Sequence, residues 1–197
     1  MTNIKVNYNF ISELEGGAQL NGYVPDAANS KSGVTIATGF DIGQCDEAAL
    51  KYLLPEFIAN KLKRFCLLKG EQALKACKQN PLNINENEAT IIDLCVKQQS
   101  TDYLVATYNK HSAIKFEQLP EPMQTVIASV AFQYGNLAKR CPNFWRTAIT
   151  QNTQAMIDEL VNFGDRYTTR RWREATYLQQ AECWSWAGFQ KYLMATQ

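Results

Sequence analysis

The sequence lacks the residues from which a metal centre is usually built. It contains one histidine, His111, and its six cysteines never occur in a Cys-x-x-Cys spacing. Zinc sites typically combine cysteine and histidine pairs at such short spacings. We therefore expect no metal and no cofactor. The cysteines are expected to be free and mostly buried thiols, because a chain of 197 residues has an ample core without disulfides.

An excess of one charge and a long apolar run are also missing. The 20 Lys and Arg residues face 19 Asp and Glu residues, so the net charge is +1 and does not favour nucleic acid as a partner. No apolar run approaches the roughly 18 residues of a membrane span, and the first ten residues lack the features of a signal peptide. We expect a monomer that is made in the cytoplasm, does not bind membranes and is exported, if at all, by another route.

The N-terminal part of the sequence combines one short helix with a glycine-rich β element. Asn9 is expected to cap a helix that runs through Glu15 and ends at Gly16-Gly17. The segment 34–41 is the best candidate for a strand, because it is β-branched and aromatic with a period of two. Six of the ten glycines lie in this part of the chain, which favours turns and strands over helix.

Helical patterns begin after this element. Asp46 is expected to cap a helix that Pro55 interrupts, and a second helical run covers about 55–78. Asn85 and Glu88 have the spacing of a capping box, which predicts the start of a long helix reaching Tyr108. Other helices are expected at 119–135, where apolar residues on nearly all sides predict a buried helix ended by Gly135, and at about 143–151, 153–163 and 169–180.

These elements define the expected fold class. With 46% hydrophobic residues, 9 Phe, 9 Tyr and 4 Trp, the chain can bury a sizeable core. We expect an α+β, mostly helical fold in one domain of residues 1–197. Its active-site lobe, with the short helix and the β element, covers 1–45 and a larger helical lobe covers 46–197. A cleft between two lobes is a natural ligand site.

Thr35 and Asp41 are the first candidates for chemistry. They lie six residues apart, so both side chains leave the same face of a strand, opposite the apolar set. A straight strand would separate them by about 20 Å, so a bend near Thr38-Gly39 is required before they can serve one bond. From these residues alone, a solvated strand face with a turn aspartate remains the simpler interpretation.

Two further carboxylates lie in the same region. Glu15 ends its helix, where the negative end of the helix dipole disfavours an ionised carboxylate and favours a proton donor. Helical geometry does not separate it from Glu13, but its position beside the glycine turn favours Glu15. Asp26 follows a proline, and a Pro-Asp pair is also common in ordinary turns. An acid and an ionised aspartate are what glycosidic cleavage needs, although paired carboxylates alone are a weak signal.

The motifs LEGG, GYVPD and SGVTIATGFDIGQ resemble the active-site lobe of the phage-type lysozymes, and within them the lysozyme-like toxin domain of the pesticin family. NINENEATIIDL resembles the long connecting helix of that fold. LPEPMQTVIASVAFQYG, with the Phe-Gln-x-Gly ending at Phe132, Gln133 and Gly135, resembles its buried central helix. The similarity spans nearly the whole chain in order and implies a lysozyme-like, two-lobed fold.

The resemblance also implies roles for individual residues. Glu15 matches the catalytic acid, Thr35 the active-site threonine, and Asp41 the aspartate that follows the threonine by six residues in the pesticin-like branch. In ordinary phage lysozymes the aspartate precedes the threonine, which would select Asp26. The TGFDIG context favours Asp41, and Asp26 and Gln133 are then expected to bind substrate. A helix-end role for Gln133, satisfying local backbone, is equally compatible with its position.

The implied function is a muramidase, a peptidoglycan hydrolase that cleaves the β-1,4 bond between N-acetylmuramic acid and N-acetylglucosamine. The resemblance favours an antibacterial toxin or secreted effector delivered to the periplasm or cell wall of a target bacterium. Its partners would be peptidoglycan glycan strands, a periplasmic immunity protein and a secretion carrier. A phage endolysin and a non-catalytic glycan-binding module are the alternatives. Whether the sugar configuration is inverted or retained depends on the carboxyl separation and stays open.

The densest basic cluster is Arg170, Arg171 and Arg173. Guanidinium groups bind carboxylates well, so the cluster could meet the acidic stem peptides of peptidoglycan. A solvated helix face is the preferred interpretation of these residues.

Overall fold

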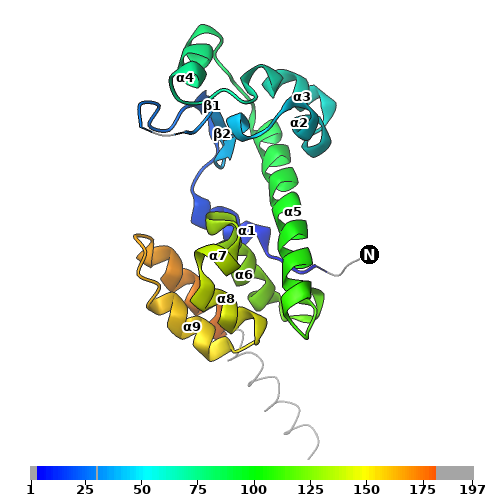
Figure 1. The fold of residues 1–197 in the computed structure, drawn as a ribbon, viewed down its shortest axis with the longest axis vertical. Coiled ribbons are helices and arrows are strands. Elements are labelled where there is room, and N and C mark those ends of the chain that lie inside the picture. The colour runs from blue at the N-terminus through cyan, green and yellow to red at the C-terminus, as the bar shows by residue number, and fades with distance from the viewer. Residues whose placement is uncertain (1–3, 30, 181–197) are drawn as a thin grey trace, which may run out of the picture. The chain divides into compact units, whose positions relative to one another are not determined.

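The computed structural model describes residues 4–29 and 31–180 of the chain (Figure 1). It is mostly helical with one small sheet, which confirms the expected α+β fold class. Its contacts divide the chain into two compact units. The sheet unit is Glu15–Gln99, and the helical unit is Met1–Leu14 with Ser100–Gln197. That residues 1–197 form a single domain stays a prediction.

The sheet unit contains three short antiparallel strands in the order β1-β2-β3. Strand β1 is Gln19–Tyr23, β2 is Thr35–Ala37 and β3 is Phe40–Asp41. The prediction of one strand over 34–41 is therefore wrong, because this segment is a tight hairpin. The required bend at Thr38-Gly39 is confirmed, and Gly39 adopts a φ of 104° there, a conformation that glycine tolerates without strain.

A distant residue holds this hairpin turn. Asp93 Oδ1 accepts hydrogen bonds from the backbone N–H of Thr38 at 3.1 Å and from its hydroxyl at 2.6 Å. Asp93 belongs to helix α5, Glu86–His111. Because the partner lies far away in the sequence, local strand propensity alone could not predict the turn.

The helices that follow begin as their caps predict. Asp46 accepts a hydrogen bond from Ala49 N at 2.7 Å and caps α2, Glu47–Leu53. Asn85 and Glu88 form both bonds of the predicted capping box, each 2.9 Å long, at the start of α5. Helix α5 ends at His111, three residues beyond the predicted Tyr108.

The predicted helical run over 55–78 is wrong, because the chain breaks into separate helices. Leu67 adopts a positive φ of 61°, and its N–H bonds to the carbonyl of Cys45 at 3.2 Å. Gly70 N bonds in the same way to Ser32 O at 2.9 Å. The chain thus returns to the β element instead of continuing the helix. The pieces are α3, Glu56–Leu62, which starts after Pro55 as expected, η2, Lys63–Phe65, and α4, Gly70–Gln79.

One hydrophobic core joins the sheet to these helices. A three-stranded sheet this small has too little apolar surface to form a core alone. Figure 1 draws α4 beside β1, in agreement with the contacts between them. The sheet unit therefore extends to residue 99 and does not end at the predicted lobe boundary, residue 45. The fully buried residues of its core include Val34, Ile36, Ile42, Leu50, Ile58, Leu62, Ala73 and Ile92.

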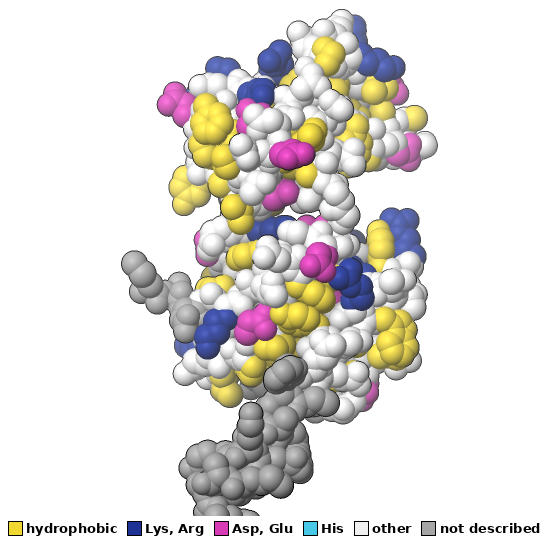
Figure 2. All heavy atoms as spheres, turned by 180° about the vertical axis from the view of Figure 1, so that it is seen from behind, with side chains coloured by type: hydrophobic (Ala, Val, Ile, Leu, Met, Phe, Trp, Pro, Cys, Tyr) yellow, Lys and Arg dark blue, Asp and Glu magenta, His cyan; other side chains and the backbone are white. Residues whose placement is uncertain are grey.

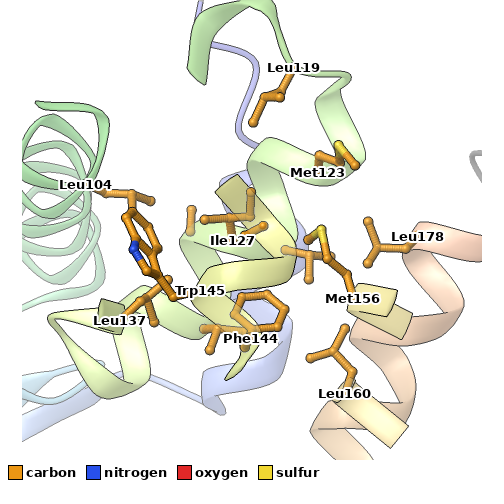
Figure 3. Close-up of a cluster of buried hydrophobic side chains, with 14 of the residues drawn as sticks. Leu104, Leu119, Met123, Ile127, Leu137, Phe144, Trp145, Met156, Leu160 and Leu178 are labelled. Atoms are coloured by element: carbon orange, nitrogen blue, oxygen red, sulfur yellow. The ribbon is translucent and has the colours of Figure 1, made fainter. Parts of the chain in front are cut away.

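The helical unit is built around the predicted buried helix. Helix α6, Glu121–Tyr134, buries every side chain from Met123 to Val130, and Gly135 ends it with a φ of 71°. Figure 3 shows Ile127 of α6 among apolar side chains from neighbouring helices. The surrounding helices are α1, Tyr8–Glu15, α7, Leu137–Arg140, α8, Pro142–Ile149, α9, Thr153–Val161, and a helix over 168–180.

Two local predictions in this unit have different outcomes. Asn7, not Asn9, caps α1, because the Asn7 side chain accepts a hydrogen bond from Phe10 N at 3.1 Å. Asn9 lies within the helix. The helices expected near 143–151 and 153–163 are present as α8 and α9, and Gly164 follows α9 with a φ of 77°.

The described thiols are free: Cys45, Cys66, Cys77, Cys95 and Cys141 form no disulfide, whereas Cys183 lies outside the described residues. Cys141 is buried and the other four are half-buried. Within residues 4–29 and 31–180, no helix has both the length and the apolar character of a membrane span. On the face drawn in Figure 2, basic and acidic side chains are interspersed, in keeping with the net charge of +1.

Candidate active site

Glu15 is the last residue of α1, where Gly16 turns the chain with a φ of 81°. The carboxylate is mostly buried, with 17% of the side chain exposed. Its Oε2 atom lies 3.4 Å from Nζ of Lys97, which is itself 6% exposed. The ammonium group thus brings a positive charge to the negative end of the α1 dipole.

Thr35 and Asp41 lie directly opposite each other in the ladder between β2 and β3. Directly opposed residues have Cβ atoms about 4.5–5.5 Å apart, so the hairpin brings together two residues that a straight strand would separate. Thr35 is buried, and its hydroxyl donates to Gly33 O at 3.3 Å. The structure therefore supplies the juxtaposition that the sequence-based hypothesis required.

Hydrogen bonds fix the orientation of the Asp41 carboxylate. Its Oδ1 accepts from the backbone N–H groups of Gly33 at 2.9 Å and Gly43 at 3.0 Å. Its Oδ2 accepts from the exposed side chain of Gln44 at 3.0 Å. One oxygen is thus held by the backbone, while the other faces an amide at the protein surface.

The close approach of two glycines makes this arrangement possible. A Cβ on Gly43 would lie 2.7 Å from the Cα of Gly33 and would also strike the carbonyl of Leu68. Only glycine fits at such a contact, because the opposing atoms are backbone and cannot move aside. The packing brings the N–H groups of Gly33 and Gly43 to the same carboxylate oxygen of Asp41.

Asp26 lies in the exposed turn between β1 and β2. It adopts a positive φ of 43° and binds Asn29 twice, through its carbonyl to the backbone N–H and through Oδ1 to the side-chain amide, each at 3.1 Å. These bonds are typical of an aspartate that stabilises its own turn. Strand pairing places Asp41, and not Asp26, beside Thr35.

Gln133 belongs to the helical unit, and its side-chain oxygen accepts a hydrogen bond from Arg171. The amide oxygen of Gln133 is therefore committed to a buried guanidinium. Arg171 is 1% exposed and also pairs with Glu174 and, at 3.0 Å, with Asp165. The sequence signalled a helix-end role or a substrate role for Gln133, but not this partner.

The preferred interpretation of the arginine cluster as a solvated face is wrong for Arg170 and Arg171. Arg170 pairs with the buried Glu174 at 3.2 Å and donates to Ser129 O at 3.0 Å. Only Arg173 of the three is exposed, where it pairs with Glu13 at 2.8 Å. A charged residue on a buried helix face needs such partners, so the cluster is mainly structural.

Titratable groups around Arg171 have shifted pKa values. Burial alone would raise the pKa of Asp165, but hydrogen bonds from the Tyr134 hydroxyl, from the backbone and from Arg171 outweigh it, so the pKa lies below its usual value. Burial and the bond to Asp165 raise the pKa of Tyr134. The network is therefore arranged to keep Asp165 ionised and Tyr134 neutral.

No described cluster of three or more His, Cys, Asp or Glu side chains could hold a metal ion. The groups that the sheet unit offers for chemistry are a mostly buried glutamate with its lysine, and an oriented aspartate opposite a threonine. Such groups can move a proton and place a water molecule or stabilise positive charge.

The fold is mostly helical α+β, and the glutamate, the aspartate and the threonine all lie in the sheet unit. These features are those of a lysozyme-like domain. The chain belongs to the pesticin family, whose model, described as a bacterial toxin homologue of phage lysozyme, C-terminal part, matches residues 5–154. The match confirms the resemblance inferred from the motifs and includes all five candidate residues. The comparison with curated proteins gave no match.

Proposed function

We propose that this protein is a muramidase that hydrolyses the β-1,4 bond between N-acetylmuramic acid and N-acetylglucosamine in peptidoglycan. The observation that carries the proposal is the placement of Asp41 opposite Thr35 in a chain of a lysozyme-homologue family. Glu15, in the same sheet unit, supplies the second carboxyl group. The pairing fits a reaction that needs one proton donor and one oriented carboxylate.

In this mechanism Glu15 donates its proton to the glycosidic oxygen as the bond to the sugar breaks. General acid catalysis of this kind contributes about 10²- to 10⁴-fold. Asp41 and Thr35 hold the attacking water or the positively charged sugar. Because backbone N–H groups hold Oδ1 of Asp41, its Oδ2 can exchange the exposed Gln44 amide for water or substrate without reorienting the carboxylate.

Asp26 and Gln133 remain proposed substrate contacts. Asp26 is exposed in the turn that precedes β2, so its carboxylate is accessible. The amide oxygen of Gln133 binds Arg171, which leaves the amide N–H₂ group as the part that could donate to a sugar. Substitution of either residue should weaken substrate binding more than the chemical step.

The test is a digest of purified peptidoglycan followed by borohydride reduction and mass spectrometry. Cleavage on the proposed side yields fragments whose reduced end is muramic acid. Glu15→Gln keeps the size of the side chain and removes the proton, so it should release no such fragments. Fragments that end in reduced glucosamine, or equal release by the variant, would contradict the proposal.

We further propose an antibacterial role, because the family description names a bacterial toxin. A muramidase can damage a cell only where it meets the wall. Expression directed to the periplasm of a Gram-negative host should therefore lyse the cells, whereas expression in the cytoplasm or of Glu15→Gln in the periplasm should not. A periplasmic immunity protein and a secretion carrier are the partners that this role implies. Lysis by Glu15→Gln would contradict the enzymatic basis of the role.

A further inference from the structure

Lys97 is a buried lysine beside the proposed catalytic acid. It lies on α5, is 6% exposed, and places its Nζ 3.4 Å from Oε2 of Glu15. The other lysine–carboxylate pair of the sheet unit, Lys61 with Glu88, differs from it because Lys61 is 37% exposed and Glu88 belongs to a helix cap. The described part of the chain thus buries Lys97 but leaves Lys61 near water.

Stability gives no sufficient reason for such a pair. Removing two charged groups from water costs several kcal/mol per ion, about as much as their attraction returns. Apolar side chains of similar size are often as stable in such positions or more so. A buried ion pair at a candidate site therefore favours a functional reason, since active sites are where burial and charge partners are arranged for chemistry.

The proposed reaction changes the charge at this place. The proton leaves Glu15 for the glycosidic oxygen, and the electron pair of the breaking carbon–oxygen bond goes to that oxygen. Glu15 then carries a full negative charge on a side chain that is only 17% exposed. An ammonium group already in place stabilises this developing charge without having to reorient.

We propose that Lys97 is a positioning residue for Glu15: its ammonium group orients the carboxyl group and balances the charge that remains after proton transfer. This inference rests on the proposed muramidase function. Two carboxylates of these two helices bind other partners, Asp93 the Thr38 hydroxyl and Glu13 the Arg173 guanidinium. Lys97 places its ammonium group 3.4 Å from the Glu15 carboxylate.

The experiment measures the release of reducing ends over a range of concentrations of purified peptidoglycan. Lys97→Met should lower the rate by about 10- to 100-fold, less than the roughly 10²- to 10³-fold lost when a donor in direct contact with the reacting oxygen is removed. Lys97→Arg should restore most of it because the positive charge returns. Lys61→Met, the matched control, removes a lysine from the exposed pair and should stay within about twofold of the wild type.

The split between kcat and KM separates a role in the reaction from a role in folding. An interaction that strengthens only as charge develops on Glu15 contributes to kcat and not to substrate binding, so Lys97→Met should lower kcat and leave KM within about twofold of the wild type. Disturbed packing of the site would change KM as well, and Lys97→Arg would not restore the rate. Should Lys97→Met fail to fold in a thermal unfolding scan, Lys97→Gln carries the same two expectations.

The outcomes distinguish this inference from the function on which it rests. An active wild type with a folded Lys97→Met of equal kcat would overturn the role of Lys97 alone. A folded wild type that releases no reducing ends would overturn the muramidase function, and this inference with it. The double variant Glu15→Gln/Lys97→Met should be inactive, yet at least as stable as Lys97→Met, because neither charge is left unpaired.

Discussion

Asp41 combines two tasks that residue substitutions can separate. Its Oδ1 satisfies two backbone N–H groups, and its charge is needed only for the proposed reaction. Asp41→Asn keeps an oxygen at Oδ1 and should change the free energy of unfolding by less than about 1 kcal/mol while activity is lost. Asp41→Ala leaves both donors without a partner and should destabilise by about 1–3 kcal/mol.

Urea unfolding of both variants, with peptidoglycan turbidity as the activity measurement, checks this pair of expectations. An Asp41→Asn variant that keeps wild-type activity would remove Asp41 from the mechanism. Equal unfolding midpoints for Asp41→Asn and Asp41→Ala would show that the two hydrogen bonds contribute little to the fold.

The thiols are expected to react slowly at neutral pH. Burial raises the pKa of Cys45, Cys66, Cys95 and Cys141, and the carboxylates of Asp41 and Asp46 add to the effect at Cys45. A raised pKa means that the folded protein holds the thiol proton up to higher pH. Each thiol therefore contributes to the free energy of unfolding at a pH below the pKa of the unfolded thiol. This contribution is lost as the pH rises through the pKa of the folded thiol.

Iodoacetamide labelling, read peptide by peptide with mass spectrometry, measures this behaviour. At pH 7.5 the four thiols should be modified more slowly than in the urea-unfolded protein, and the difference should shrink as pH increases. A labelling rate in the folded protein that equals or exceeds that of the unfolded chain would contradict the expectation.

At the scale of elements, the hairpin that carries the site depends on a close backbone contact. A Cβ on Gly43 would meet the backbone of Gly33 and Leu68, so Gly43→Ala must push β3 away from its neighbours. We expect a loss of about 1–3 kcal/mol in the free energy of unfolding, as for other overpacked sites. Activity should fall as well, because the Gly43 N–H orients Asp41.

Gly17→Ala is the matched control for this substitution. A Cβ at Gly17 meets nothing within 4 Å, so the free energy of unfolding of Gly17→Ala should stay within about 0.5–1 kcal/mol of the wild type. Thermal unfolding of the two variants in parallel makes the comparison. Equal transition temperatures would contradict the close contact at Gly43.

The network around Arg171 joins α6, the segment before residue 168 and the helix over 168–180. Arg171→Met would leave the buried carboxylate of Glu174 without its guanidinium, and we expect a loss of about 3–5 kcal/mol. Arg173→Met removes the exposed partner of Glu13 and should cost at most about 1 kcal/mol. Urea unfolding compares the two, and similar losses would argue against a structural role for the buried pair.

The elements that the sequence predicted best are those whose signals are local. The Asp46 cap, the Asn85 and Glu88 capping box and the buried helix before Gly135 each depend on residues within a few positions of one another. The local pattern at 35–41 predicts one strand and not a hairpin, because the residue that holds the hairpin turn, Asp93 of α5, lies far away in the sequence. The helix break at Leu67 likewise depends on a bond to Cys45, which no local pattern contains.

In the candidate site, too, local sequence signals predict some residues, whereas others depend on long-range packing. The order and spacing of Glu15, Thr35 and Asp41 match a family, which makes them candidates. Strand geometry requires the bend that joins the last two. Lys97 was missed, since one lysine in a long helix has no spacing that relates it to Glu15. The burial of Arg171 was missed as well, because its partners Asp165, Glu174 and Gln133 are defined by the packing of separate segments.

At the scale of the whole molecule, the proposed catalytic residues are concentrated in one compact unit. Glu15, Thr35, Asp41 and Lys97 all belong to Glu15–Gln99, and a single hydrophobic core supports the β element that carries two of them. The helical unit contributes the buried α6 and the ion network of Arg171. Rigid packing of this kind is what a site with oriented carboxylates requires, because misplacement of a reacting group lowers the rate steeply.

The measurement that tests the central claim most directly is turbidity loss of purified peptidoglycan with the wild type, Glu15→Gln, Asp41→Asn and Asp26→Asn in parallel. Our account predicts clearing by the wild type and by Asp26→Asn, and none by Glu15→Gln or Asp41→Asn, with all four proteins folded. Clearing by Asp41→Asn together with an inactive Asp26→Asn would contradict the assignment of the second carboxylate. A folded wild type that clears nothing would contradict the muramidase function itself.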